Sequence, residues 1–194
     1  MKVLWFAVNP SLYDAHRNGE HNGGGWIASL EKIIRTSDNI RLGVAFEHPD
    51  PIFKKEIDGV CYYPIRVKPG LRRRIYASEK DKIIIADCLK VIEDFKPDII
   101  HVFGSEWGFG LVEKYVDIPV VIHMQGSLPP YVNASYPPGY NFFTQWKTSH
   151  YNPIVLLKRR FVWSRDDNYK VAREIDILKP VSYTHLTLPT NSRV

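Results

Sequence analysis

Residues 3–8 read VLWFAV, and this unbroken apolar run decides the fold of the chain. A run of this length without a polar residue is typical of a strand that is covered on both faces in a parallel sheet. A polar, glycine-rich loop follows at residues 18–25, and apolar residues then recur at helical spacing over residues 27–34. The N-terminal part of the sequence therefore predicts a strand, a glycine-rich loop and a helix, in that order.

The alternation of strands and helices continues through most of the chain. Further strands are predicted over residues 41–46, 60–65, 99–103 and 118–122, and helices over residues 83–95 and 107–116. Strands that alternate with helices need crossover connections, which place the strands in parallel in one sheet. We therefore expect an α/β fold with a Rossmann-like parallel sheet and helices on both of its faces.

Residues 124–153 interrupt this pattern. The segment contains five prolines and seven aromatic residues, but no aspartate or glutamate. Long loops in compact domains are usually functional or disordered, and the aromatic content argues against disorder. We interpret the segment as a functional loop. Helical sequence resumes over residues 154–179, and we expect it in two pieces that separate near residues 166–168.

The composition excludes several classes of protein. Apolar residues make up 44% and charged residues 24% of the 194-residue chain, which excludes wholesale disorder and fits one ordinary domain. Cys61 and Cys88 are too few for a disulfide scaffold and favour a reducing compartment. No apolar stretch is long enough for a signal peptide core or a membrane span, so we expect a soluble, cytoplasmic protein. The net charge of +5 permits an anionic partner without selecting one.

Polar residues follow the predicted strands at their carboxyl ends, where ligands bind in open parallel sheets. Asn9 follows the first strand, Glu106 follows the fourth, and His123, Gln125 and Gly126 follow the fifth. Apolar strands need no such residues for their stability. We therefore predict a binding cleft at this edge of the sheet.

Gly23, Gly24 and Gly25 directly precede the first predicted helix. Glycines let the backbone approach a ligand closely, and the free N–H groups at a helix start favour an anion such as phosphate. A flexible turn is the alternative, because the spacing matches neither of the common phosphate-binding glycine motifs. From these residues alone, both interpretations remain open.

The two histidines near the predicted cleft receive different interpretations. His123 ends an apolar strand, so it could hydrogen-bond a substrate hydroxyl or accept a proton, and we favour this functional role. His101 lies inside a strand, and we interpret it as structural. Glu106 follows a Gly-Ser turn and would either bind a hydroxyl or cap the next helix, so both roles stay open.

Other kinds of site have less support. The histidines and cysteines lack metal-ligand spacing, and no G-x-S-x-G motif or nucleophilic cysteine context is present, so we expect no metal. Residues 154–174 carry six basic and three acidic side chains with aromatic neighbours. A solvated surface is the default interpretation, with contact to anionic lipid as the alternative. Nucleic-acid binding is not expected, because no recognition motif accompanies the charge.

Four stretches taken together resemble the N-terminal domain of family 4 glycosyltransferases. They are residues 2–5 (KVLW), 22–26 (NGGGW), 96–102 (KPDIIHV) and 120–126 (VVIHMQG), and the likeness covers residues 1–180. The resemblance implies the N-terminal half of a GT-B arrangement, in which this Rossmann-like domain mainly receives the acceptor. A C-terminal domain would bind the nucleotide-sugar donor.

The resemblance also implies an activity and roles for single residues. The activity is retaining transfer of a sugar from a nucleotide-sugar co-substrate to a hydroxyl of a saccharide or glycolipid, as in polysaccharide biosynthesis, without a further cofactor. His123 matches the histidine that contacts the transferred sugar. Residues 23–25 would face the cleft near donor phosphate, with Glu106, Gln125 and Gly126 beside the substrate. Phe103 departs from the family's pattern, which has a second histidine there.

The chain also resembles only part of such an enzyme. Residues 181–194 continue no pattern, and we interpret them as a non-native or disordered tail, with a genuine flexible terminus as the alternative. The donor-binding domain with its paired glutamates is absent, so we expect no turnover by this chain alone. A fragment of a nucleotide-sugar epimerase and a non-catalytic carbohydrate- or partner-binding module remain alternatives. Peripheral contact with the inner membrane face also stays open.

Overall fold

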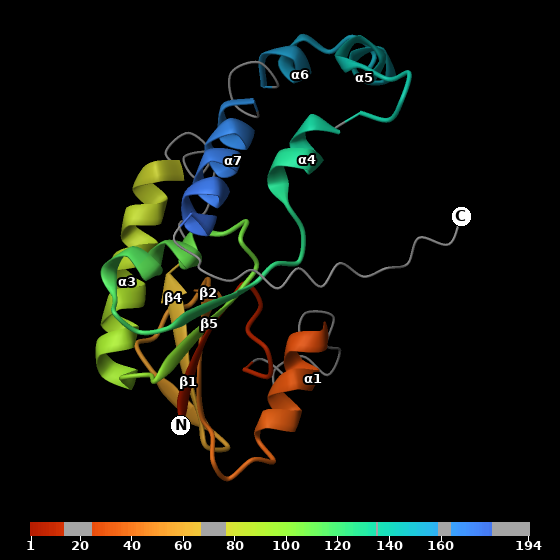
Figure 1. The fold of residues 1–194 in the computed structure, drawn as a ribbon. Helices are drawn as coiled ribbons and strands as arrows, with labels where there is room; N and C mark the ends of the chain where they lie inside the picture. The colour runs from red at the N-terminus through yellow and green to blue at the C-terminus, as the bar shows by residue number, and fades with distance from the viewer. Residues whose placement is uncertain (14–24, 67–76, 135, 159–163, 180–194) are drawn as a thin grey trace.

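The computed structural model describes residues 1–13, 25–66, 77–134, 136–158 and 164–179 (Figure 1). In these residues a six-stranded sheet has the strand order β3-β4-β2-β1-β5-β6. The strands are β1 (Lys2–Ala7), β2 (Arg41–His48), β3 (Lys55–Ile57), β4 (Val60–Arg66), β5 (Ile99–Phe103) and β6 (Val120–His123). The helices are α1 (Gly25–Ile34), α3 (Ala77–Phe95), the 3₁₀ helix η1 (Gly108–Tyr115), α4 (Leu128–Asn133), α5 (Phe142–Thr148), α6 (Pro153–Lys158) and α7 (Ser164–Leu178).

Strand β1 lies in the middle of the sheet and pairs in parallel with β2 on one side and β5 on the other. Its side chains alternate between the two faces, as strand geometry requires. Val3, Trp5 and Ala7 enter the core under α1, whereas Leu4 and Phe6 enter the core under α3. All five are buried, which confirms the prediction of a central strand covered on both faces.

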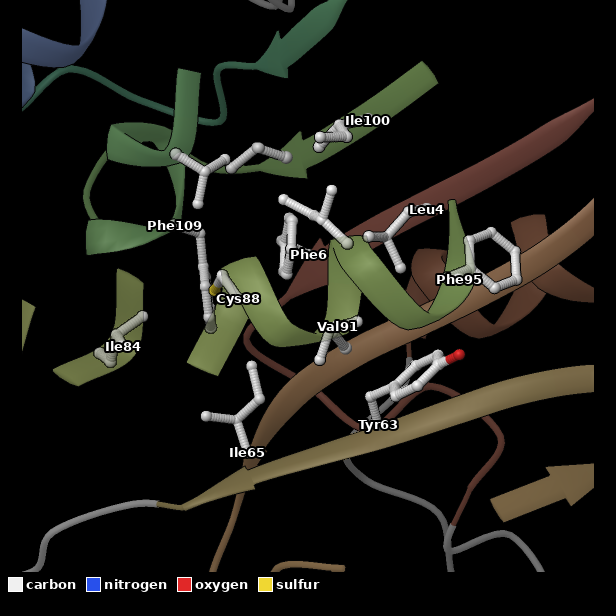
Figure 2. Close-up of a cluster of buried hydrophobic side chains, with 14 of the residues drawn as sticks. Leu4, Phe6, Tyr63, Ile65, Ile84, Cys88, Val91, Phe95, Ile100 and Phe109 are labelled. Carbon is white, nitrogen blue, oxygen red and sulfur yellow. The ribbon is translucent and has the colours of Figure 1, made fainter. Parts of the chain in front are cut away.

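Two hydrophobic cores therefore lie on opposite faces of the sheet, with α1 over one and α3 and η1 over the other (Figure 1). Figure 2 shows the larger core, which contains Phe6 of β1 and Cys88 and Phe95 of α3. The ring of Phe6 stacks on that of Phe109 from η1. The Phe95 ring packs so closely on β2 that a Cβ at Gly43 would lie 3.0 Å from it. The expected Rossmann-like α/β fold with helices on both faces is confirmed.

Two local details differ from the sequence prediction. The helical sequence over residues 154–179 does form two helices, α6 and α7, but α7 runs without a break through residues 166–168, where the separation was expected. Asp166 and Asp167 instead occupy its first turn, where acidic side chains favour the positive helix end, and Lys170 pairs with Asp166 one turn later at 2.6 Å. Strand β3, antiparallel to β4, was not predicted, because three residues are too few to show a period.

The aromatic segment is also more regular than a loop. It contains α4, α5 and α6, which we call, with their connections at residues 128–158, the aromatic arm. None of these three helices has a buried residue. The arm extends away from the sheet beyond the carboxyl ends of the strands, before α7 returns toward η1 and α3 (Figure 1).

The contrast between core and arm gives a stability prediction. Phe95→Ala should lower the free energy of unfolding by about 3–5 kcal/mol, because it removes a buried ring and leaves a cavity. Phe143→Ala, at an exposed position in the arm, is the matched control and should change it by about 0.5 kcal/mol or less. Urea unfolding followed by circular dichroism measures both. Equal losses in the two variants would contradict the assignment of the core.

Candidate functional site

The candidate site lies at the carboxyl ends of β1, β5 and β6. In the strand register, His101 of β5 stands between Trp5 of β1 and Val121 of β6, and Phe103 pairs with His123 in the next row. These five side chains share the face of the sheet that carries α1, because they alternate with residues of the other core. The order of strands reverses at β1, which is where open α/β sheets bind ligands.

Four rings form a continuous surface here, which we call the histidine shelf: Trp26, His101, Phe103 and His123. The rings of His101 and Phe103 lie 4.2 Å apart between centroids. Trp26, from the first turn of α1, lies 5.2 Å from Phe103 and 5.0 Å from His123. Phe103 is buried, whereas the Trp26 side chain is 44% exposed and His123 is exposed. The outer rim of the shelf is therefore an indole beside an imidazole.

His123 is held by its backbone rather than by its ring. Its carbonyl accepts a hydrogen bond of 2.9 Å from the backbone N–H of Gly104, which joins the ends of β5 and β6. Among the described residues, no side chain or backbone group hydrogen-bonds to the imidazole of His123. Because a neutral imidazole has one donor and one acceptor nitrogen, this ring can both donate to and accept from a ligand hydroxyl.

His101 lies deeper in the shelf and has a different electrostatic environment. Its ring packs against Phe103 and meets the edge of Trp5 at 6.2 Å. Burial, with a smaller contribution from the charge of His123, lowers the pKa of His101 from 6.5 to about 4. His101 is therefore neutral at pH 7 and supplies a flat, uncharged floor next to the exposed His123.

Of the predicted glycine-rich loop, only the last residue, Gly25, lies within the described residues, and it directly precedes Trp26 of the shelf. Gly23 and Gly24 lie outside the described residues, so the structure leaves their predicted roles untested. Gly25 begins α1 with φ +41°, and a Cβ there would meet no atom within 4 Å. The next residue, Trp26, contacts His123. The end of the predicted loop and the predicted histidine are therefore neighbours.

Gln125 and Gly126 follow β6 and are both exposed. A Cβ at Gly126 would also have open space around it, since no atom lies within 4 Å. They occupy the connection from His123 to the first helix of the arm. The open backbone on either side of His123 leaves room for a ligand to approach.

Glu106 folds back over Gly104. A Cβ at Gly104 would lie 2.5 Å from Glu106 Oε2, so a side chain there would displace the carboxylate, and the φ of +90° also favours glycine. Glu106 does not cap the following helix, because the N-cap of η1 is Trp107 without a side-chain hydrogen bond. Of the two roles predicted for Glu106, the helix cap is therefore wrong. No described group hydrogen-bonds to its carboxylate, which leaves the oxygens available beside the shelf.

A buried glutamate that the sequence did not single out holds the loops around the site. Glu174 of α7 is 1% exposed and accepts a 2.7 Å hydrogen bond from the backbone N–H of Leu128, the first residue of α4. Its other oxygen accepts from the Ser105 hydroxyl, in the loop after β5. Glu174 therefore fixes the loops after β5 and β6 relative to each other.

Next to it, a second carboxylate fixes α7 itself. Asp81 of α3 accepts a hydrogen bond from the Tyr169 hydroxyl at 2.6 Å, and both of its carboxylate oxygens accept from Arg173 Nη1 at 3.0 Å. The other terminal nitrogen of Arg173 donates to the Glu106 carbonyl. The only sequence signal for either carboxylate is an acidic residue on the apolar side of a helix, which is easily taken for a surface charge.

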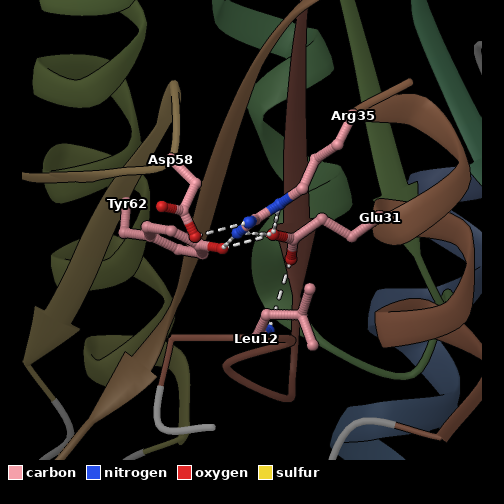
Figure 3. Close-up of polar contacts among 5 residues, drawn as sticks. All are labelled: Leu12, Glu31, Arg35, Asp58 and Tyr62. Carbon is pink, nitrogen blue, oxygen red and sulfur yellow. Dashed lines mark hydrogen bonds and ion pairs between the residues drawn. The ribbon is translucent and has the colours of Figure 1, made fainter. Parts of the chain in front are cut away.

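Figure 3 shows the corresponding arrangement at the loop after β1. Glu31 of α1 is fully buried and accepts hydrogen bonds from the Leu12 backbone at 3.3 Å, from Arg35 at 2.9 and 2.7 Å, and from the Tyr62 hydroxyl. Arg35 also reaches Asp58 at 2.9 Å. Burial, followed by the bond to Glu31, raises the pKa of Tyr62, so this phenol stays protonated as a donor. The loop that leads toward the glycines is therefore anchored to α1 and β4.

A metal site has no counterpart in the described residues. Nowhere in residues 1–13, 25–66, 77–134, 136–158 and 164–179 do three or more His, Cys, Asp or Glu side chains gather so as to hold an ion. In the part of the chain that the structure describes, the polar groups at this edge include those of the shelf, Glu106, and the exposed Asn9 and Gln125.

No family model matches this sequence, and no curated protein matches it either. Among solved structures, the chain is similar to sucrose-phosphate synthase from Thermosynechococcus elongatus, with 10% identity and a TM-score of 0.50 over 84% of this chain and 45% of that one. It is also similar to UDP-GlcNAc 2-epimerase from Neisseria meningitidis bound to UDP-GlcNAc, with 19% identity and a TM-score of 0.43 over 71% of this chain and 36% of that one.

These comparisons establish a fold and no family. The likeness to the sucrose-phosphate synthase is one of fold, and it agrees with the expected GT-B-like architecture. The chain spans less than half the length of either neighbour. The family 4 assignment is not established by them.

The role of Glu174 can be tested by two substitutions. Glu174→Ala should lower the free energy of unfolding by about 2–4 kcal/mol, because the N–H of Leu128 and the hydroxyl of Ser105 lose their acceptor. Glu174→Gln keeps one acceptor oxygen and should lose roughly half as much. Amide hydrogen exchange at Leu128 should quicken in the alanine variant. An unchanged rate there would show that Glu174 does not hold the loop.

The environment of His101 predicts a dependence of stability on pH. Since the folded-state pKa is about 4, lower than the ordinary 6.5, only the unfolded chain takes up this proton between these values. Its contribution to stability is therefore complete above pH 6.5 and falls as the pH is lowered toward 4. Urea unfolding across this range should show a shallower decline for His101→Phe than for the wild type. Parallel curves, or an imidazole NMR titration of His101 near 6.5, would contradict the burial argument.

Proposed function

We propose that this chain is the acceptor-side domain of a retaining, family 4-like glycosyltransferase, which moves a sugar from a nucleotide-sugar to a hydroxyl of a saccharide or glycolipid. The observation that carries the proposal is the pairing of Trp26 with His123 at the carboxyl end of a parallel sheet. An exposed indole supplies a face for a sugar ring, and an imidazole with both nitrogens available supplies a donor and an acceptor for its hydroxyls.

The other groups at the rim support carbohydrate as the ligand. Within the described residues nothing hydrogen-bonds to the Glu106 carboxylate, so its oxygens can accept from sugar hydroxyls, and a Cβ at Gly126 would meet no atom within 4 Å. Such a mixture of one aromatic face and a few polar groups is typical of small-molecule sites. His123 would contact the transferred sugar, and Gln125 would lie next to it on the same connection.

The N-terminus of α1 is the natural place for donor phosphate in this proposal. Residues 23–25 lead into a helix of ten residues, whose first N–H groups and dipole favour an anion. The donor base and the remaining contacts would come from a second domain, because the chain spans 45% of the sucrose-phosphate synthase that it resembles in fold. We therefore expect no turnover by this chain alone.

Two alternatives use the same shelf differently. An epimerase would act on the nucleotide-sugar itself and would need acidic and basic side chains in its N-terminal half. A non-catalytic module would bind carbohydrate with no donor at all. The proposal further places the protein in the cytoplasm, with a lipid-linked acceptor at the inner membrane face.

The proposal can be tested on this chain by binding. Titration with UDP- and GDP-sugars and with neutral oligosaccharides, followed by imidazole NMR, should shift the His123 signals in preference to those of His150. His123→Ala should weaken binding about tenfold or more, which corresponds to about 1.4 kcal/mol, through loss of hydrogen bonds and of the ring beside Trp26. His150→Ala, an exposed histidine in the arm, is the matched control and should bind like the wild type.

The outcomes separate the alternatives. Binding of saccharides without nucleotide-sugars would favour the module. Conversion of a nucleotide-sugar to its epimer would favour the epimerase. Saccharide affinity that is equal in wild type and His123→Ala would remove the shelf from the site and overturn the proposal.

A further inference from the structure

We propose that the aromatic arm is a docking surface for an anionic lipid membrane. The inference rests on the proposed function, which supplies the lipid-linked acceptor. A membrane bound to the arm would bring that acceptor close to the histidine shelf. The evidence is the exposure, the composition and the position of the arm.

The arm exposes large apolar side chains that a folded chain normally buries. Tyr131 is 75% exposed and Phe143 is 70% exposed. The side chains of Tyr140, Tyr151, Ile154 and Leu157 are also more than half exposed. Six large exposed apolar side chains within this short segment make it a candidate interaction surface.

Polar contacts within the arm, rather than burial, hold it in shape. Asn141 caps α5 by accepting from the Thr144 backbone at 3.0 Å. The Trp146 indole N–H donates to the Asn152 carbonyl at 3.1 Å, and its ring meets Tyr151 edge-on at 5.2 Å. The apolar groups are therefore presented outward by a local scaffold.

The charge of the arm selects an anionic partner. The sequence contains no aspartate or glutamate between residues 118 and 165, and five lysines and arginines lie in this stretch. Two of them, Lys147 and Lys158, are exposed in the last turns of α5 and α6. Tyrosine, tryptophan and phenylalanine beside lysine are the residues that settle at the boundary of headgroups and acyl chains. Anionic headgroups would meet cations here without any carboxylate to repel them.

The arm overlaps only the first part of residues 154–174, for which the sequence left lipid contact open as the alternative to a solvated surface. Two of the basic residues that follow in α7 are paired within the fold. Arg173 is engaged with Asp81, and Lys170 pairs with Asp166. Two basic residues of α7 are therefore already neutralised within the fold, whereas α4, α5 and α6 contain no buried residue.

The position of the arm joins the membrane to the candidate site. Helix α4 begins two residues after Gly126, and its first N–H is fixed by Glu174. The arm then extends beyond the carboxyl ends of the strands (Figure 1). A bilayer touched by Tyr131 and Phe143 would lie next to the loop that leads from His123.

None of the described helices is both long and apolar enough to cross a membrane.

Vesicle flotation tests the inference with this chain. Vesicles of equal parts phosphatidylcholine and phosphatidylglycerol should carry the protein to the top of a density gradient, and vesicles of phosphatidylcholine alone should carry far less. The double variant Tyr131→Ser/Phe143→Ser should lower the floated fraction about fivefold or more. Lys147→Glu should lower it on the anionic vesicles, and added salt should do the same.

A matched control makes the same changes elsewhere. Tyr115→Ser/Phe53→Ser replaces a tyrosine and a phenylalanine that are 59% and 61% exposed outside the arm, and it should float like the wild type. Circular dichroism should show that both double variants are folded.

Three results would overturn the inference. They are an equal loss in both double variants, equal flotation with both lipids, and no flotation of the wild type. Self-association that the arm variant abolishes, with no lipid binding, would instead make a second copy of the chain the occupant. Flotation needs no nucleotide-sugar, so its failure leaves the saccharide titration of His123 unaffected, and failure of that titration leaves flotation unaffected.

Discussion

In a parallel sheet the carboxyl ends of the strands lie along one edge. The backbone N–H groups in the loops that follow these ends need hydrogen-bond acceptors. This chain satisfies two of them with buried carboxylates from helices. Glu31 accepts from Leu12 after β1, and Glu174 accepts from Leu128 after β6. Burying a carboxylate is costly unless it is fully hydrogen-bonded, so each helix must sit in one place for its glutamate to be satisfied. The geometry of the candidate site depends on these two contacts.

The strands of the sheet could be predicted well because each is a short, mostly apolar run that can be recognised without knowledge of the rest of the chain. Residues 3–8, 99–103 and 60–65 are apolar runs whose burial requires no knowledge of the rest of the chain. Helix α7 shows the limit of this reasoning. Asp166 and Asp167 are ordinary breakers by composition, but they lie in the first turn of a helix, where the same side chains are favourable.

The candidate site could be predicted in part for a similar reason. His123 stands out because it ends an apolar strand, and its exposure follows from that position. Trp26 could not be placed beside it, because the approach of α1 to β6 is decided by packing between segments far apart in sequence. The Glu174 contact is equally non-local, joining α7 to residues 46 and 69 positions away. Contacts of this kind leave no period in a single sequence.

The two cysteines have a practical consequence. Cys61 of β4 and Cys88 of α3 are fully buried free thiols in the same core, on a strand and on the helix that covers it. Burial also raises the pKa of the Cys88 thiol, so little reactive thiolate exists while the core is closed. A water-soluble alkylating reagent therefore reaches these thiols only when the core opens locally. The rate at which the two thiols are labelled would therefore measure how often this core opens.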